Sequence, residues 1–363
     1  MGHILGMDER QAQQYIFTLG TVCVFALLLR NIWLTLFMWL SVLLFAYYKF
    51  ECGQIYISNL FFGSVIYYLV KVAFKKEHIP FFINAFLWLI FINLGYMVCQ
   101  LAKFDFIYKM SMSNCLGEQF YLDASEPVGF FGFRAMMAVV MAMAIPIFLS
   151  KRTKIGDLCA LGMVIPLWLG KCSIAWAAAV IVSIFMLKNR LSRKAFIAAT
   201  LGLVLLGTAY IVKVDAPMGM LPTRIHQWKM ALTDARVHWV SGWGLDSFRT
   251  PTSWKPSVYA MNATINPDGS KYAAVWDNPH NLYVSLVYEW GILGILLLIG
   301  YMRQLVMSYG AARKDPETVA LAGFLIVFFI VSLAQFPIFL ARTAAFIIPA
   351  FALFEVACKR EEE

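Results

Sequence analysis

A few residues in this strongly apolar chain have side chains suited to chemistry, and they lie in one long polar segment. Arg224 lies in its first part, and Asp277 and His280 lie three positions apart near its end. An imidazole exchanges protons near neutral pH and can serve as a general base, and Asp277 is a candidate to orient it. A guanidinium binds phosphate through its planar fork. These residue types predict proton transfer beside a bound anion.

Composition determines what kind of protein holds these residues. Of 363 residues, 61% are apolar and 14% are charged, and the mean hydropathy is +0.70. These values exclude a soluble enzyme, a disordered chain and a disulfide scaffold. The formal charge of +9 comes mainly from Lys and Arg between apolar runs, so it reports topology and predicts no nucleic-acid partner. Membrane lipids are the expected surroundings.

The apolar runs predict an all-α, polytopic membrane protein with about 11 transmembrane helices (10–12), because each bilayer crossing needs roughly 20 apolar residues. The predicted domains are an N-terminal bundle over 1–212, a long, partly helical periplasmic loop over 213–281, and three last helices within 282–363. The predicted spans are 15–29, 32–48, 55–74, 81–101, 128–149, 155–169, 172–187, 195–212, 282–301, 319–340 and 343–358.

Cations in the short connections predict the orientation, because Lys and Arg are retained on the cytoplasmic side. Most of them, including the group from Lys151 to Lys154 and the group from Lys188 to Lys194, fall on the side of the C-terminal tail. With eleven spans the N-terminus lies outside, and with twelve it lies inside. Either way the segment 213–281 is expected on the outer face.

Three further cations are predicted at that outer face: Lys171 and Arg342 at junctions between spans, and Arg134 about six residues inside the span 128–149. An ionisable group within a span is costly unless it faces water or a partner, although snorkelling to lipid phosphates is an alternative for all three. If they converge with Arg224, they form a site for a lipid phosphate or pyrophosphate.

Within the polar segment, 222–240 is predicted to form a helix at the membrane surface, closed by Ser241 and Gly242. Arg224 and Trp228 share one face of this helix because they lie four residues apart. For Trp228, an anchoring or packing role is the alternative to binding a sugar. The stretch after this helix, up to Pro279, is rich in Pro, Asn and Gly and is expected to be irregular.

The end of the segment carries a motif. Asp277-Asn278-Pro279-His280-Asn281 runs into a predicted helix with Glu289-Trp290-Gly291 and Gly294, and it follows the Arg224/Trp228 helix, a Gly242-Trp243-Gly244 turn and Phe248. In order and spacing this resembles the O-antigen ligase and polymerase family, over about 75 residues. Gly170-Lys171-Cys172-Ser173 is similar to the basic residue beside a Ser in that family, although the usual Ser-Arg order is not kept.

The resemblance implies transfer of a glycan from an undecaprenyl-pyrophosphate carrier to an acceptor hydroxyl at the periplasmic face of the bacterial inner membrane. It implies no nucleotide sugar, metal or other cofactor. His280 is the candidate base and Arg224 the candidate pyrophosphate ligand. Candidate substrate-binding residues are Lys171, Arg134, Trp228, Asn281, Asp277 and Arg342.

Several alternatives stay open at this point. A ligase, whose acceptor is a lipid-A core sugar, and a polymerase, whose acceptor is another carrier-linked glycan, share this motif. A transporter or flippase for a lipid-linked glycan is the alternative from another class. A capping or core role is the alternative for His280, and Asn281 most simply caps the helix that follows it.

Overall fold

The structure is a computed structural model with side chains. It describes residues 32–47, 54–105, 127–132, 134–188, 190, 192–210, 220–244, 247–248, 263–265, 271–273, 279–312, 315–335, 337–339 and 341–359. The chain divides into two compact units. Unit 1 comprises Met1–Ala73, Leu221–Ser308 and Leu333–Gln335, and unit 2 comprises Phe74–Met220, Tyr309–Ser332 and Phe336–Glu363.

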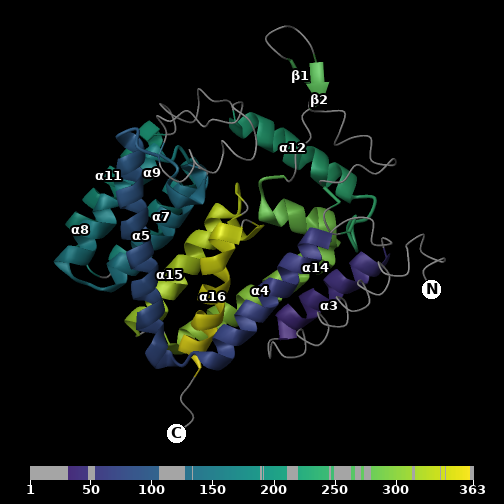
Figure 1. The fold of residues 1–363 in the computed structure, drawn as a ribbon, viewed down its shortest axis with the longest axis horizontal. Helices are drawn as coiled ribbons and strands as arrows, with labels where there is room; N and C mark the ends of the chain where they lie inside the picture. The colour runs from purple at the N-terminus through teal and green to yellow at the C-terminus, as the bar shows by residue number, and fades with distance from the viewer. Residues whose placement is uncertain are drawn as a thin grey trace. The chain divides into compact units, whose positions relative to one another are not determined.

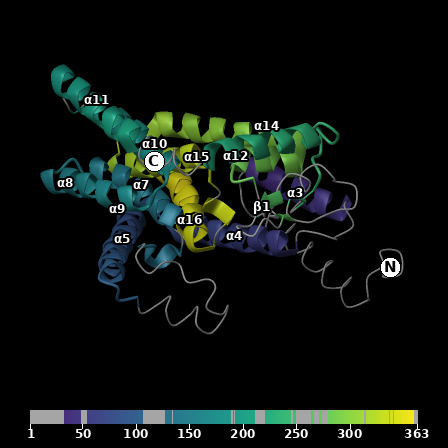
Figure 2. The ribbon, with the colours of Figure 1, turned by 90° about the horizontal axis from the view of Figure 1, so that it is seen from above.

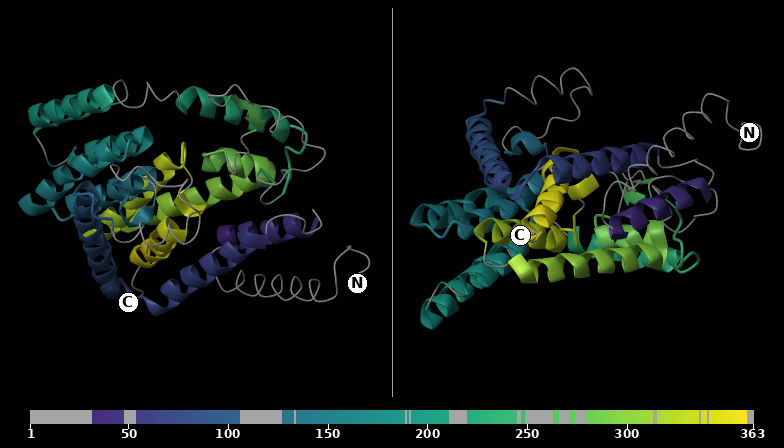
Figure 3. Two further views of the ribbon diagram at one scale, coloured as in Figure 1. Left: turned by 45° about the horizontal axis from the view of Figure 1, so that its top comes forward. Right: turned by 90° about the horizontal axis from the view of Figure 1, so that it is seen from below.

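Unit 1 is built from α3 (Ile32–Tyr47), α4 (Gln54–Ala73), nearly all of α12 (Met220–Ala235) and most of α14 (Leu282–Ala312). Helices α3 and α4 lie side by side (Figures 1 and 3). Helices α12 and α14 lie near each other (Figure 1). They share a small apolar core, which contains Ala231, Ala235, Val284 and Tyr288. This core holds together the two helices that carry the predicted motif.

A short hairpin also belongs to unit 1. Strands β1 (Ala263–Ile265) and β2 (Lys271–Ala273) pair antiparallel, with Thr264 opposite Tyr272. They lie in the stretch predicted to be irregular, so that prediction is wrong for these six positions. β-Branched Thr264 and Ile265 and aromatic Tyr272 favour extended backbone. Every other regular element among the described residues is a helix.

Unit 2 is organised around α7 (Arg134–Ser150), which is buried from Met136 to Ser150. Helices α10 (Ser173–Leu187) and α15 (Pro316–Val331) pack along it (Figure 2). The other elements of unit 2 are η1 (Lys76–His78), α5 (Ile79–Leu101), η3 (Gly129–Phe131), α8 (Lys154–Gly162), α9 (Val164–Leu169), α11 (Arg193–Tyr210), η6 (Pro337–Phe339) and α16 (Ala341–Cys358).

Helices occupy at least part of every predicted span that the structure describes, while the first, 15–29, lies outside the described residues. The predicted span 319–340 is too long, because α15 ends at Val331 and a turn and η6 follow it. The predicted span 155–169 is two helices, α8 and α9, separated at Met163. Pro166 has no N–H to donate to the Gly162 carbonyl, which explains the break. The total number of crossings stays a prediction.

Two of the described helices are long and apolar enough to cross a bilayer, Lys76–Leu101 and Leu282–Gly310, and several shorter apolar helices accompany them. Along α5 one face is buried, with Ile83, Phe86 and Ile90, while Phe81 and Trp88 on other faces are 71% and 68% exposed. Large apolar side chains facing outward in this way fit a lipid environment.

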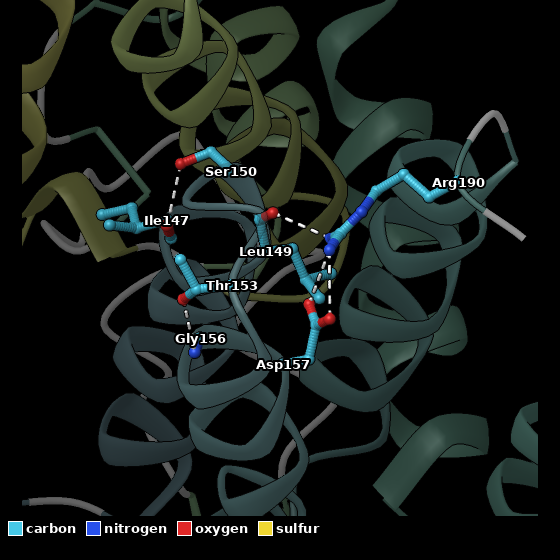
Figure 4. A network of polar contacts seen from close by, with 7 residues as sticks. All are labelled: Ile147, Leu149, Ser150, Thr153, Gly156, Asp157 and Arg190. Carbon is cyan, nitrogen blue, oxygen red and sulfur yellow. Dashed lines mark hydrogen bonds and ion pairs between the residues drawn. The ribbon is translucent and has the colours of Figure 1, made fainter.

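Polar contacts close one end of unit 2 (Figure 4). The Arg190 guanidinium donates to the Leu149 carbonyl at 2.9 Å and to the Asp157 carboxylate at 3.0 Å. The Thr153 hydroxyl caps α8 by accepting from Gly156 N–H at 3.0 Å. Arg190 therefore joins the end of α7, the start of α8 and the connection between α10 and α11. The two basic groups in these connections, from Lys151 to Lys154 and from Lys188 to Lys194, are predicted to share one side of the membrane.

Candidate active site

Helix α12 presents one inward face to the rest of unit 1. Gln227, Ala231 and Ala235 on this face are buried, and Arg224 and Trp228 are half-buried. Their spacing of three and four residues places them in one stripe along the helix. The predicted helix over 222–240 is too long, because α12 ends at Ala235.

A tight turn replaces the last part of the predicted helix. The N–H groups of Arg236, Val237 and His238 each bond a carbonyl three residues earlier, which is the pattern of a 3₁₀ turn. Gly242 then has a φ of 70°, a conformation that favours glycine. The chain turns here because the segment that follows packs closely onto α14.

Helix α14 is interrupted at Gly291, which has φ 64° and ψ −158°. A Cβ there would lie 2.3 Å from the Val240 carbonyl oxygen, and a Cβ on Gly242 would lie 2.4 Å from the Glu289 carbonyl carbon. The two backbones touch at these glycines. This contact explains why the motif needs glycine at both positions.

The break in α14 at Gly291 and the turn at 239–244 form hydrogen bonds with each other's backbone groups. Trp243 and Gly244 N–H donate to the carbonyls of Tyr288 and Glu289, at 2.8 and 3.1 Å. In return, Ile292 N–H donates to the Trp239 carbonyl at 2.8 Å, and Leu293 N–H lies 3.5 Å from the Val240 oxygen. The groups left over where the helical ladder breaks are thus paired with the turn, as buried backbone requires.

The residues 279–281 lead into α14 and are held by α12. The Trp228 indole N–H donates to the Pro279 carbonyl at 2.7 Å. His280 follows with a φ of 50°, an uncommon value for a residue other than glycine. Asn281 caps α14, because its side-chain oxygen accepts from the N–H groups of Tyr283 and Val284 at 2.9 and 3.1 Å.

The short segment Leu333–Gln335, which belongs to unit 1, connects the same two elements. The Arg224 Nη1–H donates to the Ala334 carbonyl at 2.8 Å. The Asn281 Nδ2–H donates to the Leu333 carbonyl at 2.7 Å. Adjacent carbonyls therefore hold a side chain of α12 and the cap of α14, and they bring Arg224 and His280 into one site.

His280 is largely uncharged at neutral pH in this site. Burial, and secondly the positive charge of Arg224, lower the pKa of its imidazole from 6.5 to about 4. Burial penalises the charged imidazolium, and a neighbouring cation adds to the penalty. The site therefore pairs a permanent cation with a neutral proton acceptor.

Comparison with known proteins gives one family match. Residues 128–299 match the family model described as O-antigen ligase. This part of the chain is similar to that family. The match agrees with the resemblance found in the sequence, and it covers 172 of the 363 residues. No curated protein matches the sequence.

The matched segment contains Arg134 and Lys171, which unit 2 brings together. Lys171 forms the turn between α9 and α10 with a φ of 45°. A Cβ on the preceding Gly170 would lie 2.9 Å from the Arg134 carbonyl oxygen and 2.5 Å from the Ala138 Cβ. The convergence of Arg134 and Lys171 with Arg224 stays a prediction.

The predicted position of Arg134, about six residues inside a helix, is wrong. Arg134 is the first residue of α7. The residues before it are held out of the helix: Gln100 Oε1 accepts from Val128 and Gly129 N–H at 3.0 and 2.9 Å, and Asn93 Oδ1 accepts from Phe130 N–H at 2.7 Å. Arg134 thus lies where a helix begins.

Two predicted site residues are not placed. Asp277 and the side chain of Arg342 lie outside the described residues, although Arg342 itself belongs to α16. Among the described residues, no three His, Cys, Asp or Glu side chains are grouped as metal ligands.

Sequence reasoning missed two features of the site. The carbonyls of Leu333 and Ala334 hold Asn281 and Arg224, and a backbone contact has no side-chain signal in the sequence. Gln227 is buried between Arg224 and Trp228 in the helix. A polar residue on the apolar stripe of an amphipathic helix is a signal that could have found it.

Proposed function

We propose that this protein transfers a glycan from an undecaprenyl-pyrophosphate carrier to an acceptor hydroxyl at the periplasmic face of the bacterial inner membrane. The observation that carries the proposal is that adjacent carbonyls hold Arg224 and Asn281, so that the charge of Arg224 acts on His280, within a segment that matches the O-antigen ligase family model.

Arg224 is proposed to bind the pyrophosphate. Its Nη1–H bond to the Ala334 carbonyl fixes the guanidinium, and a guanidinium has five N–H donors in total. In the transfer, the bond between the sugar carbon and the pyrophosphate oxygen breaks, and negative charge grows on that oxygen. A fixed cation stabilises the growing charge, which is the main contribution this reaction needs from the protein.

His280 is proposed to remove the acceptor proton. As the acceptor oxygen bonds to the sugar carbon, its proton passes to the neutral imidazole. A pKa of about 4 makes His280 available as an acceptor but a weak base. A bound pyrophosphate offsets the charge of Arg224, so its arrival raises the basicity of the imidazole when the donor is in place.

The other predicted residues receive supporting roles in this proposal. Lys171, Arg134 and Arg342 add positive charge for the carrier phosphates, and Asp277 orients the imidazole. Trp228 and Asn281 position the loop, because Trp228 bonds the Pro279 carbonyl and Asn281 bonds the Leu333 carbonyl. The proposed chemistry requires no metal and no cofactor.

The test is transfer by the purified protein in detergent or nanodiscs, with a carrier-linked glycan as donor. We expect His280→Ala and Arg224→Ala to lower the rate by about 10²-fold or more. Matched controls are His78→Ala and Lys229→Ala, because both residues are exposed and lie outside the site.

The acceptors in this assay also decide between the open alternatives. Transfer to lipid-A core marks a ligase, and lengthening of a carrier-linked glycan marks a polymerase. Carrier binding without transfer to either acceptor contradicts the proposal and favours a transporter. Full activity of both site variants contradicts the assigned roles.

A further inference from the structure

Gln227 is a buried polar residue that the structure leaves unsatisfied. Its side chain is in α12 and the residue is only 5% exposed. Among the described residues, neither the amide oxygen nor the amide nitrogen has a hydrogen-bond partner. Burying an unpaired amide costs free energy, and each such group in a folded protein needs an explanation.

The position of Gln227 explains why its amide is left unpaired. It lies three residues after Arg224 and one before Trp228, on the face that these residues turn inward. Its neighbours on that face are both engaged, Arg224 with the Ala334 carbonyl and Trp228 with the Pro279 carbonyl. Gln227 therefore lies one helical turn from the arginine proposed to hold pyrophosphate, on the same face of α12.

The chemistry of a primary amide narrows the ligand. The Gln227 side chain offers one acceptor and two donor hydrogens, and both functions are unused. A phosphate at neutral pH accepts hydrogen bonds but has few protons to donate. A sugar ring offers hydroxyl or acetamido groups that both donate and accept, so it is the group that satisfies both ends of the amide.

The spacing between Arg224 and Gln227 indicates which sugar of the glycan Gln227 contacts. Positions three apart on a helix have Cβ atoms about 5–6 Å from each other. That separation matches a pyrophosphate at Arg224 and, beside it, the sugar bonded to it. We propose that Gln227 is a substrate-binding residue that recognises the sugar attached directly to the pyrophosphate, and this inference rests on the proposed function of Arg224.

The stability of a Gln227 variant separates substrate binding from a purely structural role. A structural role predicts that replacing Gln227 lowers the melting temperature, whereas the proposed role does not. Gln227→Leu removes no hydrogen bond to any described residue and replaces an unpaired amide with an apolar group of similar size. Its melting temperature should equal or exceed that of the wild type. The control is Gln100→Leu, because Gln100 accepts from Val128 and Gly129 N–H and donates to Asp105. That variant should melt at a lower temperature.

The decisive measurement compares two ligands of the full-length protein: undecaprenyl pyrophosphate with its glycan and undecaprenyl pyrophosphate alone. For Gln227→Leu we expect about tenfold weaker binding of the glycan-linked carrier and unchanged binding of the bare carrier. Arg224→Gln should weaken the binding of both ligands.

Other outcomes separate the two proposals. Equal loss for both ligands in Gln227→Leu, or unchanged binding of both, overturns the sugar-recognition role while leaving the role of Arg224 intact. A lower melting temperature without any change in binding shows that Gln227 is structural. If the wild type binds neither ligand, the proposed function fails and the inference fails with it.

Discussion

Replacing Arg224 with Gln should change the protonation of His280 by a measurable amount. The folded protein lowers the pKa of the imidazole from 6.5 to about 4. At about 1.4 kcal/mol for each pH unit, the site disfavours the imidazolium by roughly 3 kcal/mol. Burial is the larger cause and Arg224 the second, so the arginine accounts for less than half. Arg224→Gln should therefore raise this pKa by up to about one pH unit.

The measurement is histidine-selective NMR of the purified protein. The chain has five histidines, and the resonance absent from His280→Gln assigns the site. In the wild type we expect this resonance to keep its neutral position from pH 8 to about pH 5 and to titrate only near pH 4. The control is Lys229→Gln, which removes an exposed cation from α12, the helix that carries Arg224. This variant should leave the titration midpoint of His280 unchanged.

The same shift has a consequence for stability. Because the folded state holds this proton more weakly than the unfolded chain, stability contributed by the neutral imidazole is complete above about pH 6.5 and is lost progressively as the pH falls toward 4. In the NMR titration, a wild-type His280 midpoint near pH 6.5 would refute the assignment of His280 to a buried site beside a cation. A His280 midpoint that does not respond to Arg224→Gln would refute it as well.

Three further changes test the framework of the site. Gly291→Ala should lower the melting temperature strongly, because alanine is strained at φ 64° and its Cβ meets backbone at 2.3 Å; Gly310→Ala, in the same helix with nothing within 4 Å, is the control and should not. Trp228→Phe should cost about 1 kcal/mol and slow transfer, since it removes the indole bond to the loop before His280, whereas Trp239→Phe, at a residue that is 62% exposed, should have little effect. Asn281→Ser should retain helix capping and be more stable than Asn281→Ala by about 1 kcal/mol, as thermal unfolding would show; equal stability of the two would contradict the capping role.

The sequence predicted the helical architecture well because apolar runs and their boundaries are local signals. It also indicated the Arg224/Trp228 face, since helical spacing is fixed by geometry. The end of α12 was predicted five residues too late, at 240 instead of Ala235. What ends the helix there is the close contact of Gly242 with α14, about fifty positions further along the chain, and no local pattern encodes such a contact.

The polar side chains that organise the site were harder to predict. For Arg134, hydropathy placed the residue inside a span, whereas side chains of α5 hold the preceding backbone out of the helix. For His280, the residue type suggested a pKa near neutrality, but the value depends on burial and on Arg224, which only the folded chain brings close.

The break at Gly291 also constrains how the protein enters the membrane. Helix α14 contains four backbone groups, the carbonyls of Tyr288 and Glu289 and the N–H groups of Ile292 and Leu293, whose partners all belong to 239–244. In lipid, each group left without a partner costs several kcal/mol. During synthesis, residues 239–244 leave the ribosome before α14 does, so the turn is available when the helix partitions from the translocon. In the proposed topology, with 213–281 outside the bilayer and α14 crossing it, insertion of this helix is coupled to the folding of the turn, and a chain lacking that turn should stall or misinsert at this step.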